Sequence, residues 1–159
     1  MEFRNINDVK LKQKISNNCW KDVKDGWIIT IDMDEWLCAT EDELMNEYNF
    51  GTAILKTCGI NIVGNSNRID LSDIDLHNLN EGIHNPSESK SVCFLRNKIS
   101  EMNYGVGCHL CNPQGISTTK SKKTFAIKHM DFLGFPVTMN KYKSRYERSA
   151  KMRTMKSQL

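Results

Sequence analysis

Apolar residues along the chain gather in short runs separated by polar turns, a pattern that predicts several short strands. The clearest run is residues 26–32, where an aromatic and several β-branched residues follow a Lys-Asp-Gly turn signal. A run of this kind predicts a strand that is buried on both faces. Further apolar runs predict strands at 52–63, 91–95, 98–103 and 124–130. Gly59 interrupts the first of these and predicts a break or bulge there.

Helices are predicted at three places. Thr40 and Glu43 form a capping box, in which each side chain satisfies the backbone N–H of the other residue, so a helix is expected over 41–48. Scattered apolar positions over 6–18 predict a short helix. The Lys- and Arg-rich segment from Asn140 onward predicts a basic C-terminal helix.

The order of these elements predicts an α/β fold with a mixed sheet, shading to α+β. We expect one domain over 1–138 and a basic helix or arm over 139–159. Residues 64–67 read as a turn, and the polar stretch 77–90 contains Gly and Asn-Pro signals of an exposed loop.

Composition suits a folded domain in a reducing compartment. Hydrophobic residues make up 39% of the 159-residue chain. The first residues show no signal-peptide pattern, and no apolar stretch reaches the roughly 20 residues that span a bilayer. We therefore expect a cytoplasmic protein without membrane insertion, whose six cysteines are reduced. The abundance of Asn, Lys and Ile is typical of a low-GC genome, such as a viral one.

The net charge of +3 hides an uneven distribution. Residues 1–119 contain 11 Lys and Arg and 17 Asp and Glu. Residues 120–159 contain 11 Lys and Arg but only two Asp and Glu. The basic end favours an anionic partner: a diphosphate, a nucleic acid, a lipid surface or the acidic part of the same chain.

Two carboxylates follow the clearest strand. Asp32 and Asp34 are two residues apart, so on an extended chain their side chains point to the same side. Ligands often bind where strands end in open sheets, and two carboxylates can hold Mg²⁺ or Mn²⁺ while leaving positions for phosphate oxygens. Glu35 is a third ligand or a supporting partner. The alternative is a solvated acidic turn that leads into the capped helix.

Cys108 and Cys111 have the spacing of a zinc knuckle. A structural zinc needs four ligands, and the remaining candidates are Cys93, His109 and His129. A redox dithiol and a pair of ordinary reduced loop cysteines are the alternatives.

Four segments resemble one known family. Trp27–Leu37, with Asp-Met-Asp-Glu after an apolar strand, resembles the metal-binding segment of GT-A-type glycosyltransferases close to family two. Ile99–His109 resembles that group's segment ending in a glycine-flanked histidine. Lys128–Gly134 resembles its later histidine strand, and Arg145–Ser149 its closing basic helix. The resemblance extends over about residues 26–155.

The resemblance implies a partial GT-A-like fold and assigns roles to named residues. Asp32, Asp34 and His129 would bind Mn²⁺ or Mg²⁺, and His109 would act as the general base. Donor or substrate contacts would come from Glu35, Lys141, Lys143 and Arg145.

The resemblance therefore predicts a metal-dependent glycosyltransferase, or a fragment of one, that moves a sugar from a nucleoside diphosphate sugar to a glycan or sugar hydroxyl. In that family a nucleotide-binding half precedes the Asp-x-Asp segment, whereas only about 25 residues precede it here, fewer than one βαβ unit needs. We therefore expect a missing N-terminal half or a partner chain. The alternatives are a nucleic-acid-binding accessory protein that uses the basic arm, and an inactive interaction subunit.

Overall fold

The structure, a computed structural model, describes residues 9–67, 70–71 and 74–156. The chain divides into two units: Met1–Ile60 with His84–Lys128, and Asn61–Ile83 with His129–Leu159. Within the described residues the helices are α1 (Val9–Asn18), α2 (Glu41–Asn49) and α3 (Phe135–Lys156). The strands are β1 (Trp27–Ile29), β2 (Glu35–Cys38), β3 (Ile54–Val63), β4 (Gly82–His84), β5 (Cys93–Leu95), β6 (Ile99–Glu101), β7 (Gln114–Gly115) and β8 (Lys120–Phe132).

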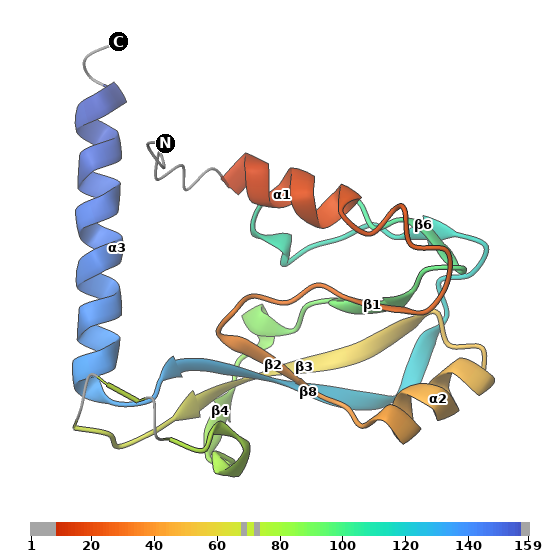
Figure 1. The fold of residues 1–159 in the computed structure, drawn as a ribbon, viewed down its shortest axis with the longest axis horizontal. Coiled ribbons are helices and arrows are strands. Elements are labelled where there is room, and N and C mark those ends of the chain that lie inside the picture. Colours follow the sequence, from red (N-terminus) through yellow and green to blue (C-terminus); the bar gives the residue numbers. More distant parts are fainter. Residues whose placement is uncertain (1–8, 68–69, 72–73, 157–159) are drawn as a thin grey trace. The chain divides into compact units, whose positions relative to one another are not determined.

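The fold is mixed α/β, as the sequence predicts (Figure 1). The main sheet has the order β1-β5-β3-β8-β2, and β4 pairs with β3. β1 runs antiparallel to β5, with Ile28 opposite Phe94, and β5 runs antiparallel to β3, with Phe94 opposite Ile54. A second, two-stranded sheet joins β6 to β7. The strands expected near 91–95, 98–103 and 124–130 are confirmed.

Alternating side chains of β3 and β5 build a core on each face of the first unit's sheet. On one face, Ile54 and Phe94 pack with Trp20, which follows α1, and the Trp20 and Phe94 rings meet edge to face at 4.9 Å. On the other face, Leu55 and Cys93 pack with residues of β2 and β8, next to α2. Figure 1 accordingly shows α1 and α2 on opposite sides of these strands.

The predicted capping box is confirmed. The Thr40 hydroxyl accepts from the backbone N–H of Glu43 at 3.2 Å, and the Glu43 carboxylate accepts from the backbone N–H of Thr40 at 2.9 Å. The helix predicted over 6–18 is also present as α1 in its described part. Both predictions rest on interactions between residues close together in the sequence, which act whatever the rest of the fold does.

Two strand predictions are wrong in detail. β1 has only three residues, and Ile29 is 46% exposed, because β1 lies at the edge of the sheet and is not covered on both faces. β3 runs through Gly59 without a break. A Cβ atom at Gly59 would lie only 2.5 Å from the Glu88 side chain, so this glycine allows the chain near 85–88 to approach the strand.

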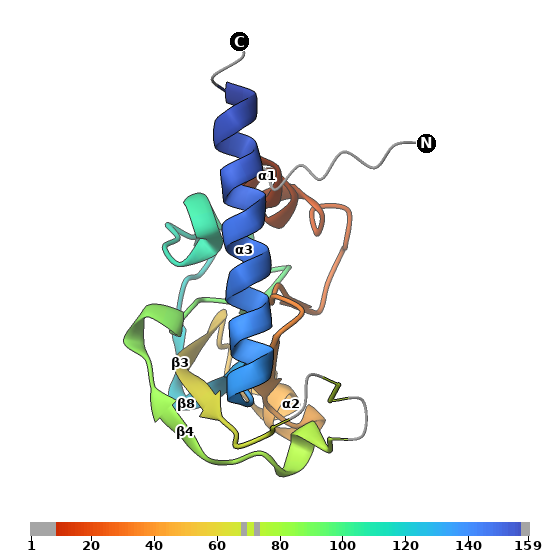
Figure 2. The same cartoon turned by 90° about the vertical axis from the view of Figure 1, so that its left-hand side faces the viewer.

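In the second unit, the ends of β3 and β8 are held together by backbone hydrogen bonds. Gly64 N–H donates to Phe132 at 2.8 Å, and Ser66 N–H donates to Leu133 at 3.2 Å. A Cβ atom on Gly134 would lie 2.1 Å from the Ser66 carbonyl oxygen, so only glycine allows this approach. The long helix α3 follows (Figure 2) and begins five residues before the predicted Asn140.

None of the helices described here is both long enough and apolar enough to cross a bilayer. The stretch 77–90, expected to be an exposed loop, contains the short strand β4 and two 3₁₀ turns, Leu76–Asn78 and Pro86–Glu88. Most of its residues are exposed, as expected, but Lys90 at its end is buried.

Candidate functional site

The acidic segment after β1 forms a tight turn. Glu35 N–H donates to the Asp32 carbonyl at 3.0 Å, and Asp32 N–H donates to the Glu35 carboxylate at 3.1 Å. The prediction that Asp32 and Asp34 share a side of an extended chain is therefore wrong, because the backbone turns between them. The turn instead brings the carboxylates of Asp32 and Glu35 to one cavity.

This cavity, which we call the Asp32 cavity, has a volume of about 250 Å³ and lies within the first unit. Its lining comes from α1, from the β1–β2 connection and from residues 90–108: Lys12, Ile15, Ser16, Cys19, Ile29, Thr30, Ile31, Asp32, Glu35, Lys90, Val92, Tyr104 and Cys108. Among the residues that the structure describes, Asp34 does not line it. The cavity thus joins an apolar wall to a small group of charges.

Lys90 is the centre of that group. Its side chain is only 5% exposed, and its ammonium group donates to the Glu35 carboxylate, which is itself 1% exposed. The same nitrogen lies 3.5 Å from Asp32 and 3.3 Å from Glu88. A buried ammonium that faces three carboxylates stays in place only while those charges balance it.

Asp32 has a second cationic partner. The Lys12 ammonium lies 2.6 Å from one oxygen of the Asp32 carboxylate and 2.7 Å from the other. Both side chains are partly open to solvent, with Asp32 35% and Lys12 42% exposed. Lys12 lies on α1, and its ion pair with Asp32 is more exposed than the contact between Asp32 and Lys90.

The electrostatics of the network favour the charged forms of Asp32 and Lys90. Burial alone would raise the pKa of Asp32, but the Lys12 and Lys90 ammonium groups outweigh it and hold this pKa below its usual 3.8. Burial alone would lower the pKa of Lys90, but the hydrogen bond to Glu35 and the charges of Glu35, Asp32 and Glu88 raise it above 10.5. Asp32 is thus an anion and Lys90 a cation at neutral pH.

His109, the predicted general base, adjoins this network through Glu88. The imidazole Nδ1 lies 2.8 Å from the Ser87 carbonyl oxygen and 4.0 Å from the Glu88 carboxylate. A carbonyl oxygen only accepts hydrogen bonds, so Nδ1 carries a proton in this contact, and in the neutral form of the ring the basic lone pair lies on Nε2. The ring is 45% exposed and accessible to a substrate hydroxyl.

Tyr104 and Thr30 close the polar side of the cavity. The Tyr104 hydroxyl donates to the Ser91 carbonyl at 2.6 Å and lies 3.0 Å from the Thr30 hydroxyl. Burial raises the pKa of Tyr104, so this phenol stays protonated and acts as a fixed hydrogen-bonding group.

The other predicted site residues lie elsewhere. Asp34 is half-buried in the first unit, and its role as a metal ligand stays a prediction. His129 is buried in the second unit, with Nδ1 3.3 Å from the Asn61 side-chain oxygen, and its role likewise stays a prediction.

The predicted phosphate-binding residues lie on α3. Lys141 forms an ion pair with the buried carboxylate of Asp131, which is also in the second unit. Lys143 and Arg145 are exposed, and the Arg145 guanidinium lies 5.5 Å from the centre of the Tyr142 ring. Their contact with a donor stays a prediction.

All six cysteines are free thiols in the structure, as the sequence analysis expects. Cys108 and Cys111 pack against the core around Trp20. Within the described residues, neither sulfur belongs to a group of three side chains that converge as metal ligands. These contacts give both cysteines a packing role in that core.

Sequence reasoning missed Lys12, Lys90 and Glu88. Lys90 lies 58 residues after Asp32 in a polar stretch, and no local pattern distinguishes it from an exposed lysine. The signal that was available is Gly59, whose missing side chain permits the close approach of Glu88 and hence of the residues around it.

Comparison with known proteins finds no match among family models, curated protein sequences or solved structures.

Proposed function

We propose that this chain is a metal-dependent glycosyltransferase, or the part of one that holds the donor's metal ion and the base. It would transfer a sugar from a nucleoside diphosphate sugar to a hydroxyl of a glycan or sugar. The observation that carries the proposal is the convergence of Asp32, Glu35, Lys12 and Lys90 on one cavity, beside the network that orients His109.

The residues present fit a hard divalent cation. Among the described residues, the three carboxylates of Asp32, Glu35 and Glu88 face the two ammonium groups of Lys12 and Lys90, so one negative charge remains when all five are ionised. If the Lys12 ammonium moves away from Asp32, two negative charges remain, which equals in size the double positive charge of Mg²⁺ or Mn²⁺. Mg²⁺ usually binds through one or two carboxylates together with substrate phosphates.

Asp32 is the ligand best placed for this role, since its carboxylate is partly exposed and its Lys12 partner is partly exposed as well. Glu35 has both oxygens occupied, one by Lys90 and one by the Asp32 backbone N–H, so it positions the turn. The roles of Asp34 and His129 as metal ligands stay predictions of the family resemblance. When bound, the ion would neutralise charge on the departing diphosphate.

The chemistry requires one proton transfer that His109 can perform. The acceptor oxygen forms a bond to the anomeric carbon, the bond from that carbon to the diphosphate oxygen breaks, and the diphosphate leaves with the bonding electrons. The hydroxyl proton moves to His109 Nε2, because Nδ1 is engaged by Ser87. Glu88 lies close enough to stabilise the imidazolium that forms.

The test is release of nucleoside diphosphate from a panel of uridine and guanosine diphosphate sugars, in the presence of Mn²⁺. Wild type should release diphosphate with at least one donor, and Asp32→Asn should reduce the rate about 100-fold or more, since a metal supplies several kcal/mol of charge stabilisation. The matched control is Asp22→Asn, an exposed acid outside the cavity. Equal rates in wild type and Asp32→Asn would contradict the proposal, and no release from any donor would contradict its form as a complete enzyme.

A further inference from the structure

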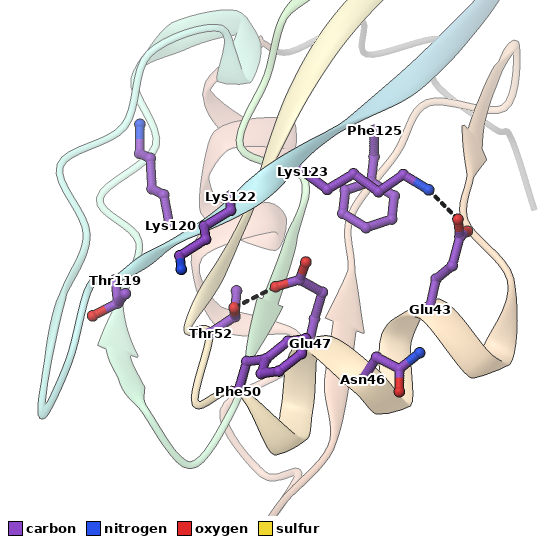
Figure 3. A pocket seen from close by; sticks show the side chains of 10 residues that line it. All are labelled: Glu43, Asn46, Glu47, Phe50, Thr52, Thr119, Lys120, Lys122, Lys123 and Phe125. Carbon is purple, nitrogen blue, oxygen red and sulfur yellow. Dashed lines mark hydrogen bonds and ion pairs between the residues drawn. The ribbon is translucent and has the colours of Figure 1, made fainter.

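A second cavity lies in the first unit between α2 and the start of β8 (Figure 3). Its volume of about 480 Å³ falls within the range of roughly 300–1,000 Å³ that is usual for small-molecule sites. We call it the Phe50 cavity. Its lining combines two aromatic rings, three lysines and several hydrogen-bonding side chains, and none of these residues lines the Asp32 cavity.

The lysines of this cavity give it a cationic side. Lys123 forms an ion pair with Glu43, whereas Lys120 and Lys122 form no ion pair with any residue that the structure describes. Figure 3 shows the Lys122 side chain pointing toward Thr52 and the Lys120 side chain pointing away from it. Lys122 is thus the cation best placed to meet an anionic group on a ligand.

Phe50 supplies an exposed aromatic surface. It caps the C-terminal end of α2, and the residue is 81% exposed. Phe125, in contrast, is buried at the floor of the cavity. The face of an aromatic ring is electron-rich, so it attracts the C–H groups on one face of a sugar ring as well as flat aromatic ligands.

The acidic and amide groups of the cavity narrow the choice of ligand. The Glu47 side chain is buried and accepts a hydrogen bond from the Thr52 hydroxyl, and Asn46 also lines the cavity. A carboxylate and an amide that line the same cavity suit hydroxyl groups, which both donate and accept. A buried carboxylate also disfavours a polyanion such as a nucleic-acid strand, because it repels a second phosphate.

We infer that the Phe50 cavity binds a sugar ring that carries a single anionic group, either a carboxylate or a phosphate. The ring packs on Phe50, its hydroxyls bond to Glu47 and Asn46, and its anionic group pairs with Lys122. This inference does not rest on the proposed glycosyl transfer, since the cavity and the site around Asp32 have no lining residue in common.

The test is a calorimetric or NMR titration of the full chain, without added metal, with glucuronate, glucose 6-phosphate, glucose and inorganic phosphate. We expect glucuronate, glucose 6-phosphate or both to bind at least fivefold more tightly than glucose and inorganic phosphate. Glucuronate alone would identify a carboxylated sugar as the ligand, and glucose 6-phosphate alone a phosphorylated one. Binding as tight with inorganic phosphate or with glucose would overturn the inference.

Two variants and two matched controls locate the binding. Phe50→Ala and Lys122→Gln change exposed residues, so both variants should fold, and each should weaken binding of the preferred sugar at least fivefold. Phe135→Ala and Lys24→Gln change exposed residues of the same types outside the cavity and should leave the affinity unchanged. Unchanged affinity in the two cavity variants, or tighter binding of an oligothymidylate than of any sugar, would overturn the inference.

Discussion

The Asp32 cavity and the Phe50 cavity both contain lysine and carboxylate side chains, but the two cavities use these charges differently. In the Asp32 cavity, Lys90 is 5% exposed and lies within reach of three carboxylates. In the Phe50 cavity, Lys122 is exposed and has no ion-pair partner among the described residues. The comparison teaches that a paired, buried charge holds a site together, whereas an unpaired, exposed charge remains available to a ligand.

Of the substitutions that test this difference between the cavities, we expect one at Lys90 to lower the free energy of unfolding most. Lys90→Met leaves three carboxylates near one another without their central cation, so we expect a loss of about 3–5 kcal/mol in the free energy of unfolding, as for other buried ion pairs that lose one partner. Urea unfolding followed by circular dichroism measures it. Adding Glu35→Gln to Lys90→Met should restore part of the stability, since it removes one of the orphaned charges. A loss below about 1 kcal/mol would contradict the role given to Lys90.

We expect a smaller loss of unfolding free energy when acid protonates Asp32. The pKa of Asp32 in the folded chain lies below its ordinary value of 3.8. The stabilising contribution of Asp32 is therefore present above that ordinary value and is lost as the pH falls through the lowered folded-state pKa. The unfolding free energy of wild type should decline more steeply below pH 3.8 than that of Asp32→Asn. Parallel declines in the two proteins would show that Lys12 and Lys90 do not hold this carboxylate.

The smallest effect is expected at Lys122. Because Lys122→Met removes an exposed charge without an ion-pair partner, the free energy of unfolding should change by no more than about 0.5 kcal/mol. The same urea experiment that is used for Lys90→Met measures it. A loss comparable to that of Lys90→Met would mean that Lys122 is a structural residue and is not available to a ligand.

The sequence predicts the local features of this fold better than the long-range ones. The capping box at Thr40 and Glu43 depends on residues three apart, and the structure confirms it. The two-sided burial of residues 26–32 depends on which strands lie beside β1, and here β1 lies at the sheet edge. Gly59 is predicted to break β3, but its role is to admit the chain near Glu88; the glycine marks a close approach without specifying which segment makes it.

In the candidate site, too, the sequence predicts local features better than long-range ones. Asp32 and Glu35 could be selected from the sequence because they follow an apolar run, and both line the cavity. The geometry assumed for Asp32 and Asp34 was wrong, because the turn at 32–35 depends on a hydrogen bond between the Asp32 backbone and the Glu35 side chain. Lys90 joins the site only through the approach of a segment 58 residues away, so sequence spacing gives no indication of it.

The central claim is that Asp32 holds a divalent cation in exchange for the Lys12 ammonium. The most direct measurement is calorimetric titration of Mn²⁺ into wild type, Asp32→Asn, Lys12→Met and the control Lys14→Met, which changes an exposed lysine on the same helix. We expect Asp32→Asn to weaken Mn²⁺ binding at least tenfold. Lys12→Met should tighten it about fivefold, because removing a competing charge near the surface is worth about 1 kcal/mol, and Lys14→Met should leave it unchanged. The same Mn²⁺ affinity in all four proteins would contradict the claim.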